Sequence, residues 1–258
     1  MAVAVLVAAA FVMVGWLAYT PEGLLGKADA IGYAVCHRID LRSFHLGDRA
    51  ISVCARCTGQ YLGALLGLVY LQIRAPRRGG DVPGRVKIVL GFMAIFYIFD
   101  GLNSFTNLIP GFPSFYTTTN TIRIFAGTGF GIVMVAFLFP AFNQTVWTDW
   151  RPEPAIRSLR DLAPLLALGA GTTSLILTGN PLVLYPASLI SAAGPLVILT
   201  MVYSMVVLLV FKKENFTGQA GRLALPLLIG FTIAMLQVSA IDLLRFFVTG
   251  TWDGFHLG

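Results

Sequence analysis

The sequence predicts an all-α, polytopic helical membrane protein, and its composition and its apolar pattern both support this prediction. Of the 258 residues, 57% are hydrophobic and only 12% are charged, and the mean hydropathy is +0.79. So few charged groups cannot cover the surface of a water-soluble globule of this length. The apolar residues fall in long runs without the alternation of barrel strands, so the membrane-spanning segments are predicted to be helices.

About seven runs are long enough to cross a membrane, because a hydrocarbon core about 30 Å thick needs roughly 20 apolar residues in a helix. The runs cover approximately residues 2–19, 54–73, 86–102, 121–142, 161–179, 187–211 and 222–248. We find no repeat, low-complexity tract or soluble domain between them. Residues 1–258 are therefore predicted to form a single helical membrane domain, in a multi-pass protein of a prokaryotic plasma membrane.

Two details refine these helices. The first run has no Lys or Arg before it and no small-x-small cleavage site after it, so we expect a retained helix and not a secretory signal. The segment GNPLVLYP at residues 179–186 contains one glycine and two prolines, which predict a tight hairpin between the fifth and sixth runs.

The basic residues predict the orientation. With seven helices, the connections at 74–87, 143–160 and 212–222 lie on one side and carry five, three and three Lys or Arg residues. The connections on the opposite side carry five, all in or next to the 20–53 segment. By the positive-inside rule the N-terminus is expected inside and the C-terminus outside.

The net charge of +6 is explained by this topology and by attraction to lipid headgroups. The expected partners are the lipid bilayer and other membrane proteins. The chain has no basic stripe with interleaved aromatic residues, so no nucleic-acid partner is predicted.

The segment at 33–63 concentrates the reactive side chains. It contains all three cysteines and two of the three histidines. Cys54 and Cys57 open a helical run three residues apart, so both thiols lie on one face at a helix N-terminus, which favours thiolates. Cys36 precedes Cys54 by eighteen residues and has His37 beside it. Three sulfurs and one nitrogen are the ligands of a tetrahedral zinc ion, so these four residues are the candidate metal ligands.

Two other interpretations of the cysteines stay open. On the outer face of the membrane Cys54 would form a disulfide with Cys57 or with Cys36, leaving one free thiol. Alternatively, all three cysteines are small apolar residues without a ligand.

Charged residues inside the helical runs are costly, of order 2.5–3.5 kcal/mol each at a helix centre, and tend to be paired or functional. The candidates for a catalytic role are Asp100, Arg123, Asp242 and Arg245, all predicted at the membrane face that carries the cysteines. Asp242 and Arg245 are three residues apart and can pair locally. Asp100 and Arg123 have no local partner and are expected to pair with each other, or with the Cys-His cluster, across the hairpin of the third and fourth helices.

Glycines predict close helix packing. Gly59, Gly63 and Gly67 recur every four residues in the second run, and Gly127 and Gly131 repeat the spacing in the fourth. Such rows let the backbones of two helices approach each other. The second, third and fourth helices are therefore expected to form a compact core with the polar cluster at its outer end.

The pattern Y-x2-C-H-R-x3-R-S-F-x2-G-x5-V-C-A-R-C-T-G-x-Y-x-G at 33–63 resembles the family of predicted membrane proteins known as domain of unknown function 2085. A second similarity follows in Asp100-Gly101 and in the N-x2-R-x3-G segment at 120–127. The resemblance covers about residues 30–135. It implies a membrane protein, and no specific activity.

Three functional classes fit these features. The first is a protein with a Cys/His site, most simply zinc, at the extracytoplasmic end of the second helix, acting on a lipid or another membrane-borne substrate. The second is a non-catalytic subunit or scaffold of a membrane complex. The third is a thiol-disulfide oxidoreductase coupled to a quinone, for which a C-x2-C pair at a helix start is suitable. Whether the protein is an enzyme stays open.

Overall fold

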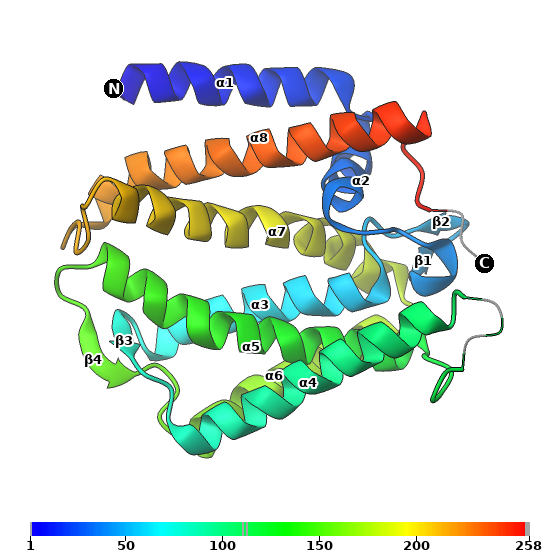
Figure 1. Ribbon diagram of the computed structural model, residues 1–258, viewed down its shortest axis with the longest axis horizontal. Coiled ribbons are helices and arrows are strands. Elements are labelled where there is room, and N and C mark those ends of the chain that lie inside the picture. Colours follow the sequence, from blue (N-terminus) through cyan, green and yellow to red (C-terminus); the bar gives the residue numbers. More distant parts are fainter. Residues whose placement is uncertain (1, 110, 112, 256–258) are drawn as a thin grey trace.

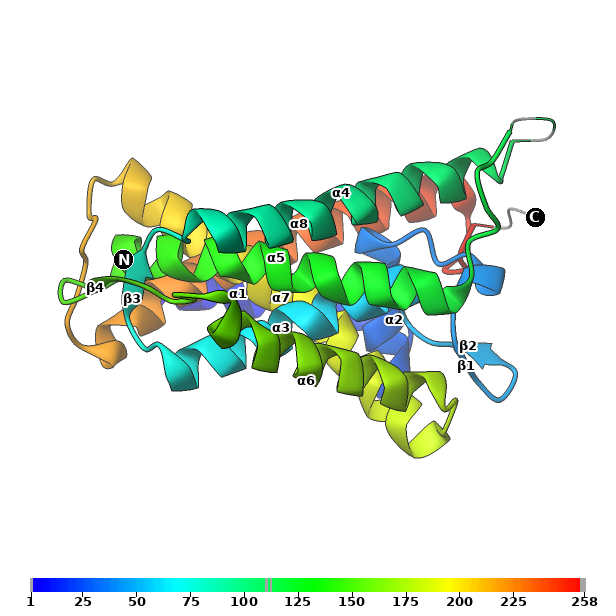
Figure 2. The same cartoon turned by 90° about the horizontal axis from the view of Figure 1, so that it is seen from below.

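The computed structural model describes residues 2–109, 111 and 113–255, which form eight α-helices. Seven are long: α1 (Ala2–Tyr19), α3 (Ala55–Arg74), α4 (Gly84–Thr106), α5 (Asn120–Val146), α6 (Leu159–Leu177), α7 (Pro181–Val210) and α8 (Ala224–Thr249). They run side by side along the longest axis of the molecule (Figures 1 and 2). The all-α prediction is confirmed, and each predicted run coincides with one long helix.

The predicted number of membrane spans was too high. Within the described residues, five helices are long and apolar enough to cross a membrane: α1, α4, α5, α7, and α8 together with the 3-10 turn η2 (Ala220–Leu223). α3 falls short because Arg56, Gln60 and Gln72 interrupt its apolar residues, and α6 because its first turn carries Arg160 and Asp161. α3 instead packs against α5, α6 and α7, which provide its apolar surroundings.

The most extensive helix contact joins α3 to α5, and glycines permit it. A Cβ atom added to Gly127 or Gly131 of α5 would overlap a backbone carbonyl of α3, and one added to Gly59 or Gly63 of α3 would overlap the backbone of α5. The two backbones therefore touch along several turns, as the glycine spacing predicted. α4 packs on α5, so the expected core of these three helices is present.

The two ends of the bundle differ. At one end β3 (Arg78–Gly80) pairs with β4 (Arg151–Pro154) in a parallel bridge between two of the basic connections. At the other end lie α2 (Gly23–Val35), the 3-10 turn η1 (Asp40–Arg42) and the hairpin of β1 (His45–Leu46) with β2 (Arg49–Ala50). Figure 1 shows these two groups on opposite sides of the molecule. The second group holds the cysteines.

α2 was not predicted, because its 13 residues are too few and too mixed to mark a membrane span. Its buried residues are mostly small and include Ala28 and Ala30, and it packs against α7 and α8. Tyr33 near its end is fully buried and its hydroxyl donates to the carbonyl of Thr251 at 2.8 Å. Because α2 ends at Val35 and is held in place by these contacts, it fixes the position of Cys36 relative to α7 and α8.

The predicted hairpin between α6 and α7 is shorter than expected. α7 already begins at Pro181, because a proline at the first helical position lacks only an N–H group that would have no partner there. The side chain of Asn180 caps the helix by accepting from the N–H of Leu182 at 2.9 Å. Gly179 makes the turn with φ +70°, and Pro186 lies inside the helix.

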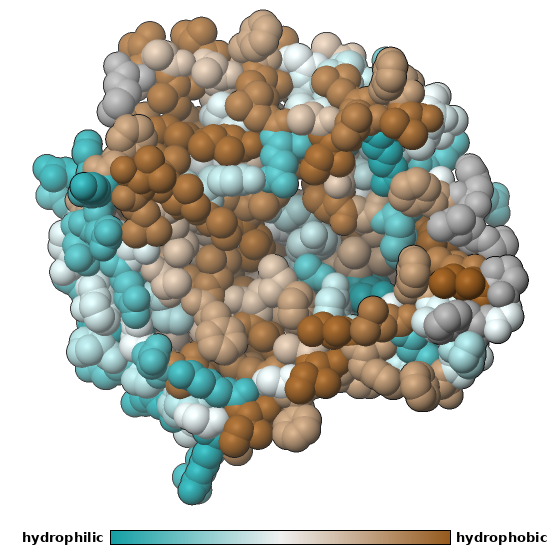
Figure 3. Space-filling model, in the orientation of Figure 1, coloured by the Kyte–Doolittle hydropathy of each residue, from teal (hydrophilic) through white to brown (hydrophobic). Residues whose placement is uncertain are grey.

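The outer face of the bundle is apolar. Phe11 of α1 is 81% exposed, Phe92 of α4 69% and Phe247 of α8 90%. Figure 3 shows hydrophobic side chains over the helices and hydrophilic ones gathered mainly towards the two ends. This distribution is that of a helical protein surrounded by lipid.

Candidate metal centre

The cysteines meet where α2 ends and α3 begins. Cys36 directly follows α2, and Cys54 is the residue before the first turn of α3. Gly32 makes the approach possible, since a Cβ there would overlap the carbonyl of Ser52. The end of α2 therefore rests on the segment that leads into α3, which brings residues eighteen apart in the chain together.

Backbone N–H groups point at the sulfur of Cys36. The N–H of Cys54 donates to the Cys36 Sγ at 3.3 Å, and that of Arg38 at 3.4 Å. Such hydrogen bonds stabilise a sulfur that carries negative charge, whether as a free thiolate or as a metal ligand. Arg38 has φ 51°, a left-handed conformation that turns the chain directly after His37.

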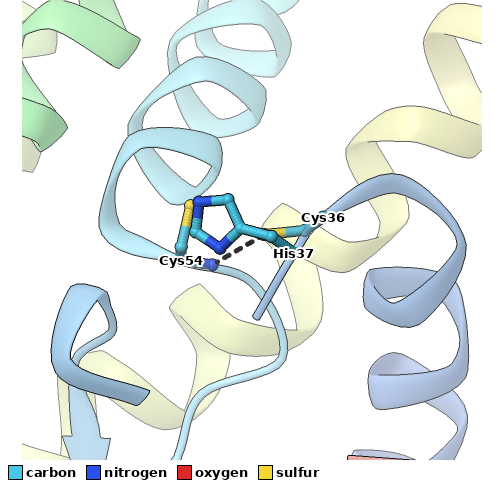
Figure 4. A group of neighbouring side chains, drawn as sticks. All are labelled: Cys36, His37 and Cys54. Carbon is cyan, nitrogen blue, oxygen red and sulfur yellow. Dashed lines mark hydrogen bonds between the residues drawn. The ribbon is translucent and has the colours of Figure 1, made fainter. Parts of the chain in front are cut away.

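The ligand atoms of Cys36, His37 and Cys54 all lie within 4.8 Å of one another. Figure 4 shows the imidazole of His37 over the side chain of Cys54, with Cys36 beside it. Ligands of a tetrahedral zinc ion with Zn–S bonds of about 2.3 Å lie roughly 3.5–4 Å apart. The separation thus fits one ion after a small contraction.

Cys57, in the first turn of α3, lies outside this group of three ligand residues, although it was predicted as the fourth ligand. It packs in the same small cluster as Cys36 and Cys54, with its thiol next to both. Hydrogen bonds with the thiols of Cys36 and Cys57, and a further one with His37, hold the pKa of Cys54 well below its usual range. All three cysteines are free in the structure, and Cys57 is the least buried of them.

His37 fits the metal less directly than the sulfurs do. Its Nδ1 accepts from the N–H of Ile39 at 3.1 Å, so a neutral ring carries its proton on Nε2. A metal ligand needs an unprotonated nitrogen, so binding would displace the Nε2 proton or release Nδ1 from Ile39. The second histidine of the segment, His45, is instead exposed and bound to Asp40 at 3.0 Å.

The structure changes the predicted partners of Asp100. Its carboxylate forms an ion pair with Arg56 of α3, and not with Arg123, and accepts from the Tyr116 hydroxyl at 2.8 Å. Arg123 donates to Asn120 at 2.8 Å and to the Ser104 hydroxyl at 3.3 Å. The predicted pair of Asp100 with Arg123 is therefore wrong, and Arg56, beside the thiols, binds the carboxylate.

Asp242 and Arg245 also do not form the predicted local pair. Asp242 is fully buried and accepts from the indole N–H of Trp16 at 3.0 Å. Arg245 donates to the carbonyls of Tyr33 at 2.6 Å and Cys36 at 2.8 Å. Arg245 therefore binds carbonyls at the C-terminal end of α2, where a cation is favourable, and so holds the backbone of Cys36 in place.

The comparisons with known proteins identify the chain as similar to predicted membrane proteins. Residues 36–137 match the family described as predicted membrane protein (DUF2085). Over 122 residues the chain is 23% identical to the uncharacterized protein MJ1492 of the archaeon Methanocaldococcus jannaschii, a match that covers 47% of this chain and 72% of that protein. No solved structure matches the chain.

The matched segment begins at Cys36 and ends within α5, so it includes the whole cysteine cluster, Asp100 and Arg123. The resemblance seen in the sequence is confirmed: residues 36–137 of this multi-pass membrane protein are similar to the family of predicted membrane proteins DUF2085.

Proposed function

We propose that the protein is a metal-centred membrane protein in which Cys36, His37, Cys54 and Cys57 hold one zinc ion. The observation that carries the proposal is the convergence of two cysteines and a histidine within 4.8 Å, with the third thiol beside them. Buried thiols so close together are costly to ionise unless a cation shares their charge. A zinc ion would supply that charge and would join α2 to α3.

With four protein ligands the centre is of the closed, structural kind. The chain's own residues then have definite tasks: the N–H groups of Arg38 and Cys54 orient the Cys36 sulfur, and Arg245 holds the carbonyl of Cys36 in place. If only Cys36, Cys54 and Cys57 held the metal and water took the place of His37, the centre would be of the open kind, which supplies an activated water for a reaction on a membrane-borne substrate. Whether His37 binds the metal therefore decides whether the centre is structural or catalytic.

The proposal is tested by metal analysis of the detergent-purified protein with thiol counting before and after chelation. We expect about one zinc per chain, and thiols that react only after the metal is removed. Cys36→Ser, Cys54→Ser and Cys57→Ser should each empty the site, and their effects should not add. His45→Gln, a histidine substitution in the same segment, should keep the full metal content and serves as the control for His37→Gln.

A metal-free protein whose cysteine variants digest with protease exactly as the wild type would exclude the metal centre. A second function, thiol-disulfide exchange, is favoured by one observation: Cys57 is a partly exposed residue next to two buried cysteines. Recovery of a Cys36–Cys54 or Cys54–Cys57 disulfide from the membrane-extracted protein, with no bound zinc, would replace the metal centre by this redox function.

A further inference from the structure

Three arginine side chains converge on the last turns of α4. Arg56 of α3 donates to the carbonyl of Asp100 at 3.1 Å and pairs with its carboxylate. Arg42 of η1 donates to the Ser104 carbonyl at 2.8 Å, and Arg123 of α5 to the Ser104 hydroxyl at 3.3 Å. Because Asp100 and Ser104 are one helical turn apart, the three guanidiniums lie within electrostatic reach of one another.

This triad, Arg42, Arg56 and Arg123, has too little negative charge around it. Among the described residues its recorded ion pair is with Asp100 alone. Arg42 and Arg123 are each only 8% exposed, so water cannot compensate their charges. Three guanidiniums facing one carboxylate leave an excess of two positive charges, and buried charges without a counter-charge are strongly unfavourable.

Neighbouring groups do not remove the excess. Asp29, another carboxylate at this end of the bundle, already binds Arg38 at 3.1 Å and also pairs with Arg49. Cys54 and Cys57 flank Arg56 in the chain, and a thiolate at either position would offset only part of the charge. If the cluster holds zinc, three thiolates and the ion together carry a single negative charge.

The triad also has unused hydrogen-bond donors. A guanidinium has five N–H groups in a planar fork, and the buried Nε atoms of Arg56 and Arg123 have no partner. Forked donors of this kind match the oxygens of a phosphate group, which can accept from two nitrogens of one arginine. Figure 3 shows the face above α4 hollowed, with hydrophilic side chains in the hollow towards the end of the bundle that carries the hairpin of β1 and β2.

The geometry points to an anion site in which Arg42, Arg56 and Arg123 bind a phosphate group beside the end of α4. This site does not require a metal at the cysteines. The phosphate comes either from an anionic lipid, whose headgroup lies at this level of the bundle, or from a soluble phosphate compound that enters from the same end. Both sources offer the triad the same oxygens and charge, and the experiment separates them.

The test uses the full chain, delipidated in a neutral detergent, with two probes. Inorganic phosphate is titrated at constant ionic strength against chloride, and binding is followed by thermal shift and calorimetry. Phosphatidylglycerol is titrated against phosphatidylcholine, and bound lipids are counted by native mass spectrometry. We expect saturable binding of at least one probe, weakened roughly tenfold or more in Arg42→Gln and in Arg123→Gln, since a hydrogen bond to a charged group contributes about 1.5–3 kcal/mol.

Arg49→Gln is the matched control, because it removes one positive charge from the same end without touching the triad. Arg123→Lys should retain part of the affinity, since it keeps the charge and loses the fork. Binding of phosphatidylglycerol alone assigns a lipid headgroup, and binding of inorganic phosphate assigns a soluble ligand. The proposal is overturned if the wild type binds neither probe, a result that needs no variant, or if Arg42→Gln and Arg123→Gln bind as tightly as Arg49→Gln.

Discussion

Arg56 of α3 binds Asp100 of α4 at two points, the side-chain carboxylate and the backbone carbonyl. Asp100 is fully buried, and the side chain of Arg56 is only 12% exposed. The pair lies one residue before Cys57, so the turn of α3 that carries the last thiol is also the turn that is fastened to α4. The cysteine cluster and the end of α4 are thereby held in one rigid region.

The first prediction concerns this ion pair. Asp100→Asn leaves the buried guanidinium of Arg56 without its counter-charge and should lower the free energy of unfolding by about 3–5 kcal/mol. Arg56→Gln should cost less, because Arg42 and Arg123 still lie near the carboxylate. The double variant removes both charges, so its loss should be smaller than the sum by about 1–3 kcal/mol. A thermodynamic cycle from unfolding in detergent measures this coupling.

Arg49→Gln combined with Asp100→Asn provides the control cycle, because Arg49 pairs with Asp29. Its effects should add within about 0.5 kcal/mol. Additivity in the Arg56 cycle as well would show that the two side chains do not stabilise each other.

The second prediction concerns the contact of α3 with α5. In Gly131→Ala the new methyl group would overlap the carbonyl of Gln60, so the helices must separate, at a cost of about 1–3 kcal/mol in unfolding free energy. Gly171→Ala in α6 is the control, since a Cβ there meets no atom within 4 Å and alanine is the better helix former. Equal melting temperatures for the two variants would contradict the close packing of α3 and α5.

These residues show which features are readable from the sequence. The row Gly59, Gly63, Gly67 and the pair Gly127, Gly131 predicted the α3–α5 contact because a four-residue spacing has one simple geometric consequence. The meeting of Cys36 with Cys54 was predicted because their chemistry has a known coordination number. α2 was missed because 13 residues of mixed polarity give no periodic signal. The predicted partner of Asp100 was wrong because the choice between Arg56 and Arg123 depends on the rotation of α3 about its axis, which the local sequence does not encode.

The third prediction is the orientation in the membrane. The connections that carry most of the basic residues lie at one end of the bundle, and the cysteine segment lies at the other (Figure 1). By the positive-inside rule, an epitope inserted between Lys213 and Glu214 should be cytoplasmic, and one inserted between Gly47 and Asp48 should be outside. Accessibility to antibody in intact and in permeabilised cells measures both. The reverse pattern would place the thiols in the reducing cytoplasm and remove the basis of the disulfide alternative.

The fourth prediction concerns α1, which has few buried residues. One of them, Trp16, donates its indole N–H to the fully buried carboxylate of Asp242 in α8. Trp16→Phe keeps an aromatic ring and removes the donor, so the carboxylate loses its partner, and we expect a loss of about 1–3 kcal/mol in unfolding free energy. Trp252→Phe, a change in the same apolar cluster, controls for the smaller ring.

Asp242→Asn distinguishes the hydrogen bond from the charge. The amide oxygen of asparagine can still accept from Trp16, while the cost of a charge in apolar surroundings disappears. Asp242→Asn should therefore be neutral or stabilising in the same unfolding measurement. If Asp242→Asn destabilises the protein as much as Trp16→Phe does, the negative charge of Asp242 is itself needed in the native state. Asp242 would then have a cationic partner in the membrane, and Arg245, three residues further along the same helix, would be the first candidate to test.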